Sequence, residues 1–303
     1  MSFSETVKRG FFNRYHKKMP FIERLLKDVS HGIIALSNYF KNGFRRKLIL
    51  VHPHYPSRGS TLYKAAGSIN YTLTNKPRKK HQLVVYWEYA TYREEFQLVE
   101  SLKDQCPVLN LYSRDISKVK VDQVHKEVFG YNTFVDPLSY SGKVVQKNDV
   151  NAIHDGQILQ GPLSRVEEGF IYQILIDNQF SEDLVLDIRV PVIGEALDFV
   201  YLKYRNIQER FKNTTVNTEV KTINEILSEA EVNLINAFCQ KIQLDYGELD
   251  VLRNKDDGKI YIVDVNNTPQ GPPANTKKEQ GEKAIAKIGE AILNKVEALA
   301  KRG

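Results

Sequence analysis

Hydrophobic residues are spaced in two different ways along this chain of 303 residues. Between residues 21 and 40 they recur every three or four positions, with Lys, Arg and polar residues between them, which predicts an amphipathic helix. From residue 47 onward they gather in short uninterrupted runs, first at 48–51 and again at 83–87. Such runs suit buried parallel strands. We therefore expect a helical extension over residues 1–46, followed by α/β structure.

Residues 47–115 are predicted to form one small α/β domain. Besides the two strands, we expect a helix over residues 92–102 and another strand over 107–111. No glycine-rich phosphate loop of either standard type occurs in this part of the sequence. Trp87 and the 16 tyrosines are interpreted as core and domain-interface packing rather than as a base-stacking platform, so nucleic acid is not an expected partner.

A β-hairpin is predicted in the C-terminal part of the chain. Two strand-like runs, 247–253 and 259–266, flank residues 254–258, which have the composition of a glycine-closed turn. Because side chains alternate along a strand, Asp264 and Asn266 are expected on the same face.

Acidic residues of the two hairpin strands are expected to meet on that face. Pairing symmetric about Asp256 would set Glu248 opposite Asp264 and Asp250 opposite Ile262. Three or four oxygen ligands then converge, and no cation lies on the hairpin's own ligand face. Oxygen clusters of this kind suit Mg²⁺ held together with substrate phosphates. The alternative, a solvent-facing hairpin with scattered acids, is disfavoured by the interleaved Ile and Val residues.

An Asp on one strand, a hairpin, and Asp-Val-Asn-x-x-Pro on the next strand resemble the metal-binding signature of ATP-grasp enzymes. The matching residues are Asp250, Asp264 and Asn266, which in that family bridge Mg²⁺ to the nucleotide phosphates. Asp264 stands where many members have Glu, so the carboxylate is on a shorter stem. The resemblance implies an ATP-grasp fold of the α/β (α+β) class, with ATP and Mg²⁺ as cofactors.

The resemblance extends over roughly residues 105–270, with several matches in family order. Residues 113–118 resemble the segment that opens the family's central domain. Residues 142–147 resemble a strand that ends in a phosphate-binding lysine, and residues 170–176 resemble the hinge strand whose backbone reads adenine. These matches imply nucleotide contacts from Lys118, Lys147, Gln173 and Ile176.

The segment from Asp187 to Gly194 resembles the Asp-x-Arg-x-x-Val-x-Gly strand of the ribosomal-protein glutamate ligase type. Lys203 falls where that type has a basic residue. A three-residue turn at residues 194–196 would place Asp187 opposite Lys203, whereas a two-residue turn would break this alignment. An ordinary ion pair of Arg189 or Lys203 with Asp187 is the alternative to a catalytic role.

One segment departs from the family pattern. Residues 148–156 contain a single glycine, where the family has a glycine-rich lid over the phosphates. Two possibilities stay open: a lid that works through Asn and His side chains, or one that closes differently. For His154, a contact within the lid and a position on the surface are both possible.

The resemblance implies three units after the basic helical extension of residues 1–46. These are an α/β domain over 47–115, a central lid domain over 116–172, and a C-terminal domain over 173–303 that contains the metal-binding hairpin and a terminal helix.

The chemistry that the resemblance implies is ligation of a carboxylate to an amine. ATP phosphorylates a carboxylate on a small molecule or polymer, and the amine attacks the resulting acyl phosphate. The candidates for contacting the transferred phosphate and the acidic substrate are four cations, since such groups suit phosphate and carboxylate oxygens: Arg189, Lys203, Arg205 and Arg210. A kinase of the same fold acting on a sugar or polyol hydroxyl, and a non-catalytic nucleotide-binding scaffold, remain as alternatives.

The positive charge of the chain is concentrated in the extension. Of the overall net charge of +6, residues 1–47 hold +8, from eleven Lys or Arg against three acids, and the rest of the chain holds −2. A basic amphipathic helix can lie on an anionic membrane surface, or it can pack on its own domain or on a second subunit in a homo-oligomer. The width of the apolar stripe favours packing.

The expected compartment is the cytoplasm, with peripheral contact at the inner membrane surface as an alternative. The N-terminus lacks the apolar stretch and cleavage site of a signal peptide, and no apolar run approaches the length of a membrane span. The two cysteines, Cys106 and Cys239, have no metal-ligand spacing and are expected to stay reduced.

Overall fold

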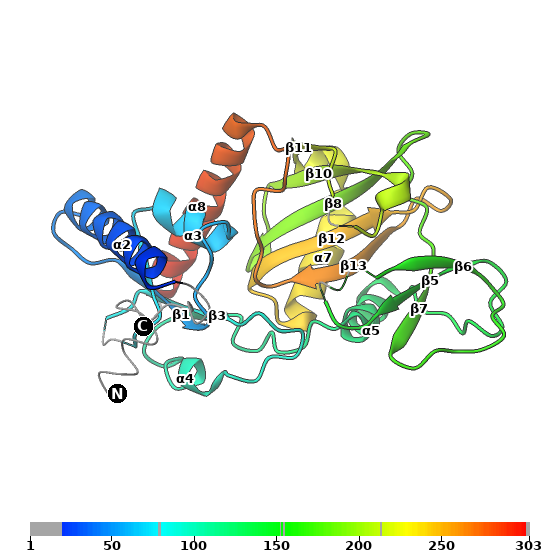
Figure 1. Cartoon of the computed structure of the whole chain (residues 1–303), viewed down its shortest axis with the longest axis horizontal. Coiled ribbons are helices and arrows are strands. Elements are labelled where there is room, and N and C mark those ends of the chain that lie inside the picture. The colour runs from blue at the N-terminus through cyan, green and yellow to red at the C-terminus, as the bar shows by residue number, and fades with distance from the viewer. Residues whose placement is uncertain (1–19, 78–79, 152, 154, 213, 301–303) are drawn as a thin grey trace.

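A computed structural model describes residues 20–77, 80–151, 153, 155–212 and 214–300 of the chain. This part contains three β-sheets and the helices that pack on them (Figure 1). In Figure 1 the N-terminal sheet lies at the left, a larger sheet lies beside it, and a three-stranded sheet lies at the right. No helix of the described residues is both long enough and apolar enough to cross a membrane. The predicted mixture of α and β structure is confirmed.

The N-terminal sheet is parallel, with strand order β2-β1-β3-β4. The two predicted strands are β1 and β3, and β3 is buried along its whole length, as an uninterrupted apolar run predicts. The side chain of Ser60 caps helix α3 by accepting a hydrogen bond from the Tyr63 N–H. The elements are β1 (Leu48–Pro53), α3 (Thr61–Ser68), β2 (Thr72–Thr74), β3 (Leu83–Trp87), α4 (Gln97–Glu100) and β4 (Val108–Leu109).

The helix predicted over residues 92–102 is wrong in extent, because only α4 is helical there. The carboxylate of Glu88 accepts hydrogen bonds from the backbone N–H groups of Glu94 and Glu95, at 3.1 and 3.2 Å. Arg93 turns inward and is 3 % exposed. These contacts hold residues 93–95 in a loop, and the helix begins only after them.

The central sheet has the order β11-β10-β8-β12-β13, with β9 folded back on β8. One face packs a hydrophobic core against α5 and α7, and alternate residues of the same strands form a polar face. Its elements are β8 (Leu184–Ile193), β9 (Glu195–Ala196), β10 (Phe199–Asn206), η1 (Ile207–Glu209), β11 (Asn217–Thr222), α6 (Ile223–Ile226), α7 (Glu229–Ile242), β12 (Tyr246–Arg253) and β13 (Ile260–Asn266).

The predicted alignment of Asp187 with Lys203 is confirmed by the pairing of β8 with β10. The connection is not a simple three-residue turn, however. Ile193 pairs with Glu195 across Gly194, and the N–H of Leu197 then bonds the Pro191 carbonyl at 2.9 Å. Both Asp187 and Arg189 therefore point to the polar face.

The predicted symmetric register of the hairpin is wrong. Asp250 pairs with Asp264, whereas Val251 pairs with Ile262, so Val263 is an extra residue in a β-bulge. Without the bulge, Ile262 and Asp264 would point to one face. The bulge turns Ile262 into the core and Asp264 onto the polar face, where Asn266 also points.

The three-stranded sheet is antiparallel, with the order β6-β5-β7. Two helices pack across the predicted domain boundaries. Helix α5 follows the N-terminal domain in sequence and packs on β13 and α7, and the C-terminal helix α8 packs on α3 in the N-terminal domain (Figure 1). The elements are α5 (Lys118–Phe129), β5 (Lys143–Asn148), β6 (Gln157–Gln160), β7 (Phe170–Ile174) and α8 (Lys278–Ala300).

The predicted extension contains helix α2 (Phe21–Lys41), which confirms the helical periodicity of residues 21–40. Residues 1–19 of the predicted extension lie outside the described part of the chain. The expectation that the apolar stripe packs against the domain is wrong, because the stripe faces solvent. The contacts of this helix are described below.

His125 of α5 is buried in an aromatic cluster. Its ring stacks on Phe129 at 4.2 Å between centroids and lies within 6 Å of the rings of Tyr131 and Tyr261, 5.1 and 5.8 Å away. Neither ring nitrogen has a hydrogen-bond partner in the described part of the chain, and the residue is 0 % exposed. Burial without such partners lowers the pKa of His125 to about 4, so the imidazole is neutral in the folded protein near neutral pH.

We predict that His125 makes the folded state lose stability in mild acid. Between pH 6.5 and about 4 the unfolded chain binds a proton at this position that the folded chain does not, so the free energy of unfolding falls as the pH falls. The loss from this group is up to about 3 kcal/mol. Urea unfolding from pH 7.5 to 4.5 should show a shallower pH dependence for His125→Phe than for the wild type. Equal slopes would contradict the prediction.

Candidate functional site

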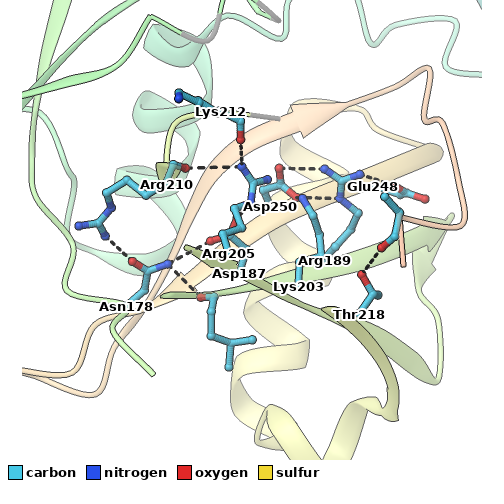
Figure 2. Close-up of polar contacts among 12 residues, drawn as sticks. Asn178, Asp187, Arg189, Lys203, Arg205, Arg210, Lys212, Thr218, Glu248 and Asp250 are labelled. Atoms are coloured by element: carbon cyan, nitrogen blue, oxygen red, sulfur yellow. Dashed lines mark hydrogen bonds and ion pairs between the residues drawn. The ribbon is translucent and has the colours of Figure 1, made fainter. Parts of the chain in front are cut away.

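A chain of charged side chains crosses the polar face of the central sheet (Figure 2). Arg189 donates from Nε and Nη2 to the two carboxylate oxygens of Asp250, at 2.8 and 3.1 Å, and its Nη1 lies 3.3 Å from Glu248 Oε2. Lys203 Nζ lies 3.8 Å from Asp250 Oδ1. Two of the hairpin acids, Glu248 and Asp250, are therefore neutralised by cations from β8 and β10, which the hairpin alone does not reveal.

A second polar group lies beside the first on the same sheet (Figure 2). Arg205 Nε is 2.8 Å from Asp187 Oδ2, and Asn178 donates to Asp187 Oδ1 at 3.0 Å. Arg210 donates to the Asn178 side chain and to the carbonyl of Ile176. The ion pair of Asp187 with Arg189 or Lys203 was the alternative to a catalytic role, and Asp187 pairs with Arg205 instead.

A cavity of about 200 Å³ lies between the polar face and the three-stranded sheet. Apolar side chains of both sheets, among them Val145, Leu252 and Val263, form part of its wall. Eight of the predicted site residues line it: Lys118, Lys147, Gln173, Ile176, Arg205, Arg210, Asp250 and Asp264. The other three, Arg189, Lys203 and Asn266, lie on the same sheet face outside the cavity lining.

Two of the acids that line the cavity, the hairpin residues Asp250 and Asp264, have opposite electrostatic environments. Burial and the nearby negative charge of Asp250 raise the pKa of Asp264 to about 6, against the attraction of Lys118 and Lys147. Burial also acts on Asp250, but Arg189 and Lys203 outweigh it and hold the pKa of that carboxyl well below its usual range. Asp264 is therefore the acid whose negative charge is least compensated.

The lysines on the other side of the cavity are held in a less polar environment. Burial lowers the pKa of Lys147 to about 8, and repulsion from Lys118 adds to the effect. Burial likewise lowers the pKa of Lys118, which the acids around it partly offset. A bound anion between the two ammonium groups would relieve this repulsion.

The donor set fits a Mg²⁺ ion that is shared with a nucleotide. Asp264 has no hydrogen-bond donor or salt-bridge partner among the described residues, and Asn266 Oδ1 accepts only the Thr268 N–H at 3.0 Å. No three His, Cys, Asp or Glu side chains of the described residues form a group that could hold a metal by themselves. Phosphate oxygens would have to complete the coordination, which is how Mg²⁺ is usually bound.

The glycine-poor loop between β5 and β6 lies over the cavity, and Val150, Ile153, Asp155 and Gly156 line it. Lys118 Nζ bonds the Val150 carbonyl at 3.0 Å and the Asn151 side chain at 3.2 Å. A Cβ atom added to Gly156 would lie 2.7 Å from the Phe211 ring, so the single glycine allows this close approach.

Side chains of the loop are used to dock it. Asp149 accepts from the Val119 N–H at 2.9 Å and from the Tyr92 hydroxyl at 2.8 Å, and Asn151 donates to the carbonyls of Ile116 and Val265. Asn and Asp side chains therefore hold the loop on α5 and β13. The predicted lid residue His154 lies outside the described residues.

Two residues that were predicted to contact the nucleotide, Gln173 and Ile176, form hydrogen bonds within the protein. The side chain of Gln173 bonds Thr133, which in turn donates to Asp122 at 2.6 Å. The carbonyl of Ile176 accepts from Arg210 and from the Asn178 N–H, both at 3.1 Å. Arg210 thus contacts the segment that directly follows β7.

The sequence-based prediction did not include Asn178 or Phe211. Asn178 connects Asp187 to Arg210, and Phe211 covers the loop glycine Gly156. Asn178 lies outside the segments that resemble the family. The sequence gives only a weak indication of Asn178. Two polar residues, Asp177 and Asn178, directly follow the apolar strand-like run of residues 170–176.

No family model and no curated protein sequence matches this chain. Among solved structures, D-alanine–D-alanine ligase from Bacillus anthracis is similar with a TM-score of 0.52 and 13% identity, covering 86% of this chain and 99% of that one. The ATP-grasp ligase PsnB, complexed with minimal precursor, Mg and ADP, has a TM-score of 0.54 at 10% identity and covers 82% of this chain and 98% of its own.

The chain has the ATP-grasp fold. The cavity lies between the central sheet and the three-stranded sheet of this fold, and eight of the eleven site residues predicted from the sequence line it. At this level of identity the similarity concerns the fold alone.

We predict that Asp264 is required for Mg²⁺-dependent binding of ATP. A nucleotide and metal that bind only the folded state raise its stability, by about 2.7 kcal/mol at a hundred times the dissociation constant. Asp264→Asn should remove most of the Mg²⁺-dependent rise in melting temperature with ATP. Asp256→Asn, the same change in the exposed hairpin turn, is the control and should keep the full rise. An undiminished rise in Asp264→Asn would refute the metal assignment.

We predict that Arg189→Gln destabilises the folded protein by about 3 kcal/mol, since two buried carboxylates would lose their shared cation. Urea unfolding measures the loss. Adding Asp250→Asn should recover part of it, because the double variant has one fewer unpaired buried charge. If the single variant is as stable as the wild type, the ion pairs do not support the sheet.

Proposed function

We propose that this protein is an ATP- and Mg²⁺-dependent ligase that joins a carboxylate to an amine through an acyl phosphate. The observation on which the proposal rests is the convergence of Lys118, Lys147 and Arg205 with Asp250 and Asp264 around one cavity. The ATP-grasp fold supports it, because the similar solved structures are of ligases by name, one of them complexed with ATP and one with Mg and ADP.

In the proposed reaction, an oxygen of the substrate carboxylate forms a bond to the γ-phosphorus of ATP, and ADP leaves. The amine nitrogen then bonds to the acyl carbon, loses a proton, and inorganic phosphate leaves. Bound Mg²⁺ would neutralise charge on the phosphates between which the transfer occurs. Lys118 and Lys147 would hold the nucleotide phosphates, and Asp250, Asp264 and Asn266 would place the metal.

We propose Lys203 as a contact to the transferred phosphate. Its ammonium group is buried, lies 3.8 Å from Asp250, and donates no hydrogen bond within the described part of the chain. Three N–H donors are therefore left for a ligand. Arg189 is already saturated by two carboxylates, so its proposed role is to position Asp250 rather than to bind substrate.

The match of β8 and Lys203 to the ribosomal-protein glutamate ligase type supports that type as the nearest in pattern. Asp187 and Arg189, which carry this match, point to the polar face beside the cavity. A substrate with a free carboxylate, small or polymeric, fits a cavity rich in cations.

The experiment measures ADP and free phosphate over a panel of carboxylates and amines, with and without hydroxylamine. A ligase should release both products and form a hydroxamate when hydroxylamine captures the acyl phosphate. A kinase would release ADP without free phosphate or hydroxamate. No turnover in spite of stabilisation by Mg²⁺·ATP would indicate a non-catalytic nucleotide-binding scaffold.

We predict that Lys203→Met lowers kcat about 100-fold or more, because an ammonium group that contacts the transferred phosphate stabilises the transition state. Lys143→Met, at an exposed end of β5, is the matched control and should leave kcat within about two-fold. Loss of binding without loss of kcat in Lys203→Met would contradict the role.

A further inference from the structure

Helix α2 presents its apolar face to solvent. Seven large side chains on one stripe of the helix are 48–71% exposed: Ile22, Leu25, Leu26, Val29, Ile33, Leu36 and Phe40. In an ordinary surface helix such a stripe faces the core of its domain. Exposed apolar area of this extent, continuous along a helix, indicates an interaction surface.

Polar contacts dock the opposite side of α2 onto the N-terminal domain. Asn38 donates to the Tyr71 carbonyl at 3.1 Å, and Asn42 donates to the Asn70 carbonyl at 2.8 Å. In the middle of the helix, Arg58 donates to the Ser30 hydroxyl at 2.7 Å. Rotating the stripe inward would break these contacts, so its outward orientation is part of the fold.

Basic residues gather where α2 ends. A cavity of about 450 Å³ lies between the helix and the edge of the N-terminal sheet, and Arg45, Arg46, Lys47 and Lys76 line it. Among the described residues, no Asp or Glu lines this cavity. Arg45 and Arg46 are exposed and form no ion pair with another described residue.

The sequence holds more positive charge in two segments, one that includes the cavity residue Lys76 and one that precedes α2 along the chain. Four of the five residues from 76 to 80 are Lys or Arg. Upstream of α2, residues 8–18 contribute five more Lys or Arg and no acid. The apolar stripe is thus flanked at both ends by cationic sequence.

We infer that α2 and the basic residues around its C-terminal end bind an anionic phospholipid surface. The stripe would enter the boundary between headgroups and acyl chains, with the helix parallel to the membrane, and Arg45, Arg46 and Lys47 would contact lipid phosphates. A second copy of this chain fits the same face less well, because pairing two copies would bring two extensions of net charge +8 together.

The arrangement leaves the nucleotide cavity in water. In Figure 1, α2 lies at one end of the molecule, and the lid sheet β5–β7, which borders the cavity, lies at the other. A membrane bound by α2 would thus hold the cavity away from the lipid, with access to soluble ATP.

The first test is sedimentation of the full-length protein with vesicles of phosphatidylcholine alone and with 30 mol% phosphatidylglycerol, where roughly a third of the lipid is charged as in an anionic bilayer. We expect binding to the anionic vesicles only. Binding should weaken with added salt, because charges are screened beyond about 10 Å at 0.1 M ionic strength. Protein that stays in the supernatant with anionic vesicles at low salt would overturn the inference.

The second test separates the stripe from general surface effects. The double variant Ile33→Asp, Leu36→Asp should bind anionic vesicles about ten-fold or more weakly. Val166→Asp, Val216→Asp makes the same charge change at two exposed apolar residues outside α2 and should bind like the wild type. Equal binding by both double variants would overturn the role of the stripe, and circular dichroism checks that each is folded.

The third test concerns the basic residues. Arg45→Gln, Arg46→Gln should weaken binding about ten-fold and flatten its salt dependence, since each basic residue near an anionic surface contributes a several-fold gain. Lys278→Gln, Lys283→Gln removes two exposed charges from α8 and should change neither. If the wild type is a dimer that Ile33→Asp, Leu36→Asp converts to a monomer, α2 is a subunit interface and the inference is wrong.

Discussion

The polar face of the central sheet depends on Arg189. It lies directly opposite Asp250 in the pairing of β8 with β12 and also reaches Glu248, so two acids share one guanidinium group. A buried carboxylate without a cation is costly, and removing one partner of such a pair leaves that cost unopposed. The register between β8 and β12 and the charge balance of the site therefore support each other.

The same interaction makes Asp250 and Asp264, which both line the cavity, differ in how far nearby cations compensate their charge. Asp250 forms ion pairs with Arg189 and Lys203. Asp264 lies opposite Asp250 in the hairpin and has no cation within salt-bridge distance among the described residues. The uncompensated charge of Asp264 is turned toward the cavity by the bulge at Val263. One acid is thus a structural partner of the sheet, and the other is left to attract a cation. Lys118 and Lys147 supply the positive side of the same cavity.

The central sheet and α2 bury opposite sides of an amphipathic structure. In the central sheet the apolar face is buried under α5 and α7 and the polar face is turned to the cavity. In α2 the polar side is buried and the apolar side is exposed. A helix docked through Asn38 and Asn42 is held by specific hydrogen bonds, so it can keep a hydrophobic surface available without rearranging its domain.

The sequence by itself determined the elements whose signal is local. The buried run at 83–87 and the hairpin around residues 254–258 follow from periodicity and turn composition, whereas the alignment of Asp187 with Lys203 was one of two alignments that the turn left open. Eight of the eleven predicted site residues line one cavity because motif order along the chain reflects their order in the fold.

Tertiary structure decided what depends on contacts between distant segments. Arg189 and Asp250 are 61 residues apart, so no local pattern predicts that they pair. Hydrogen bonds to the Glu88 carboxylate keep residues 93–95 in a loop. Hydrogen bonds such as that of Asn38 to the Tyr71 carbonyl determine which face of α2 is turned to solvent, and the periodicity of the sequence does not reveal them. The β-bulge depends partly on the sequence and partly on the tertiary structure. The spacing of three residues between the core residues Ile262 and Val265 indicates a bulge, but only the pairing with β12 identifies Val263 as the extra residue. Periodicity specifies which side chains share a face, whereas packing specifies what that face meets.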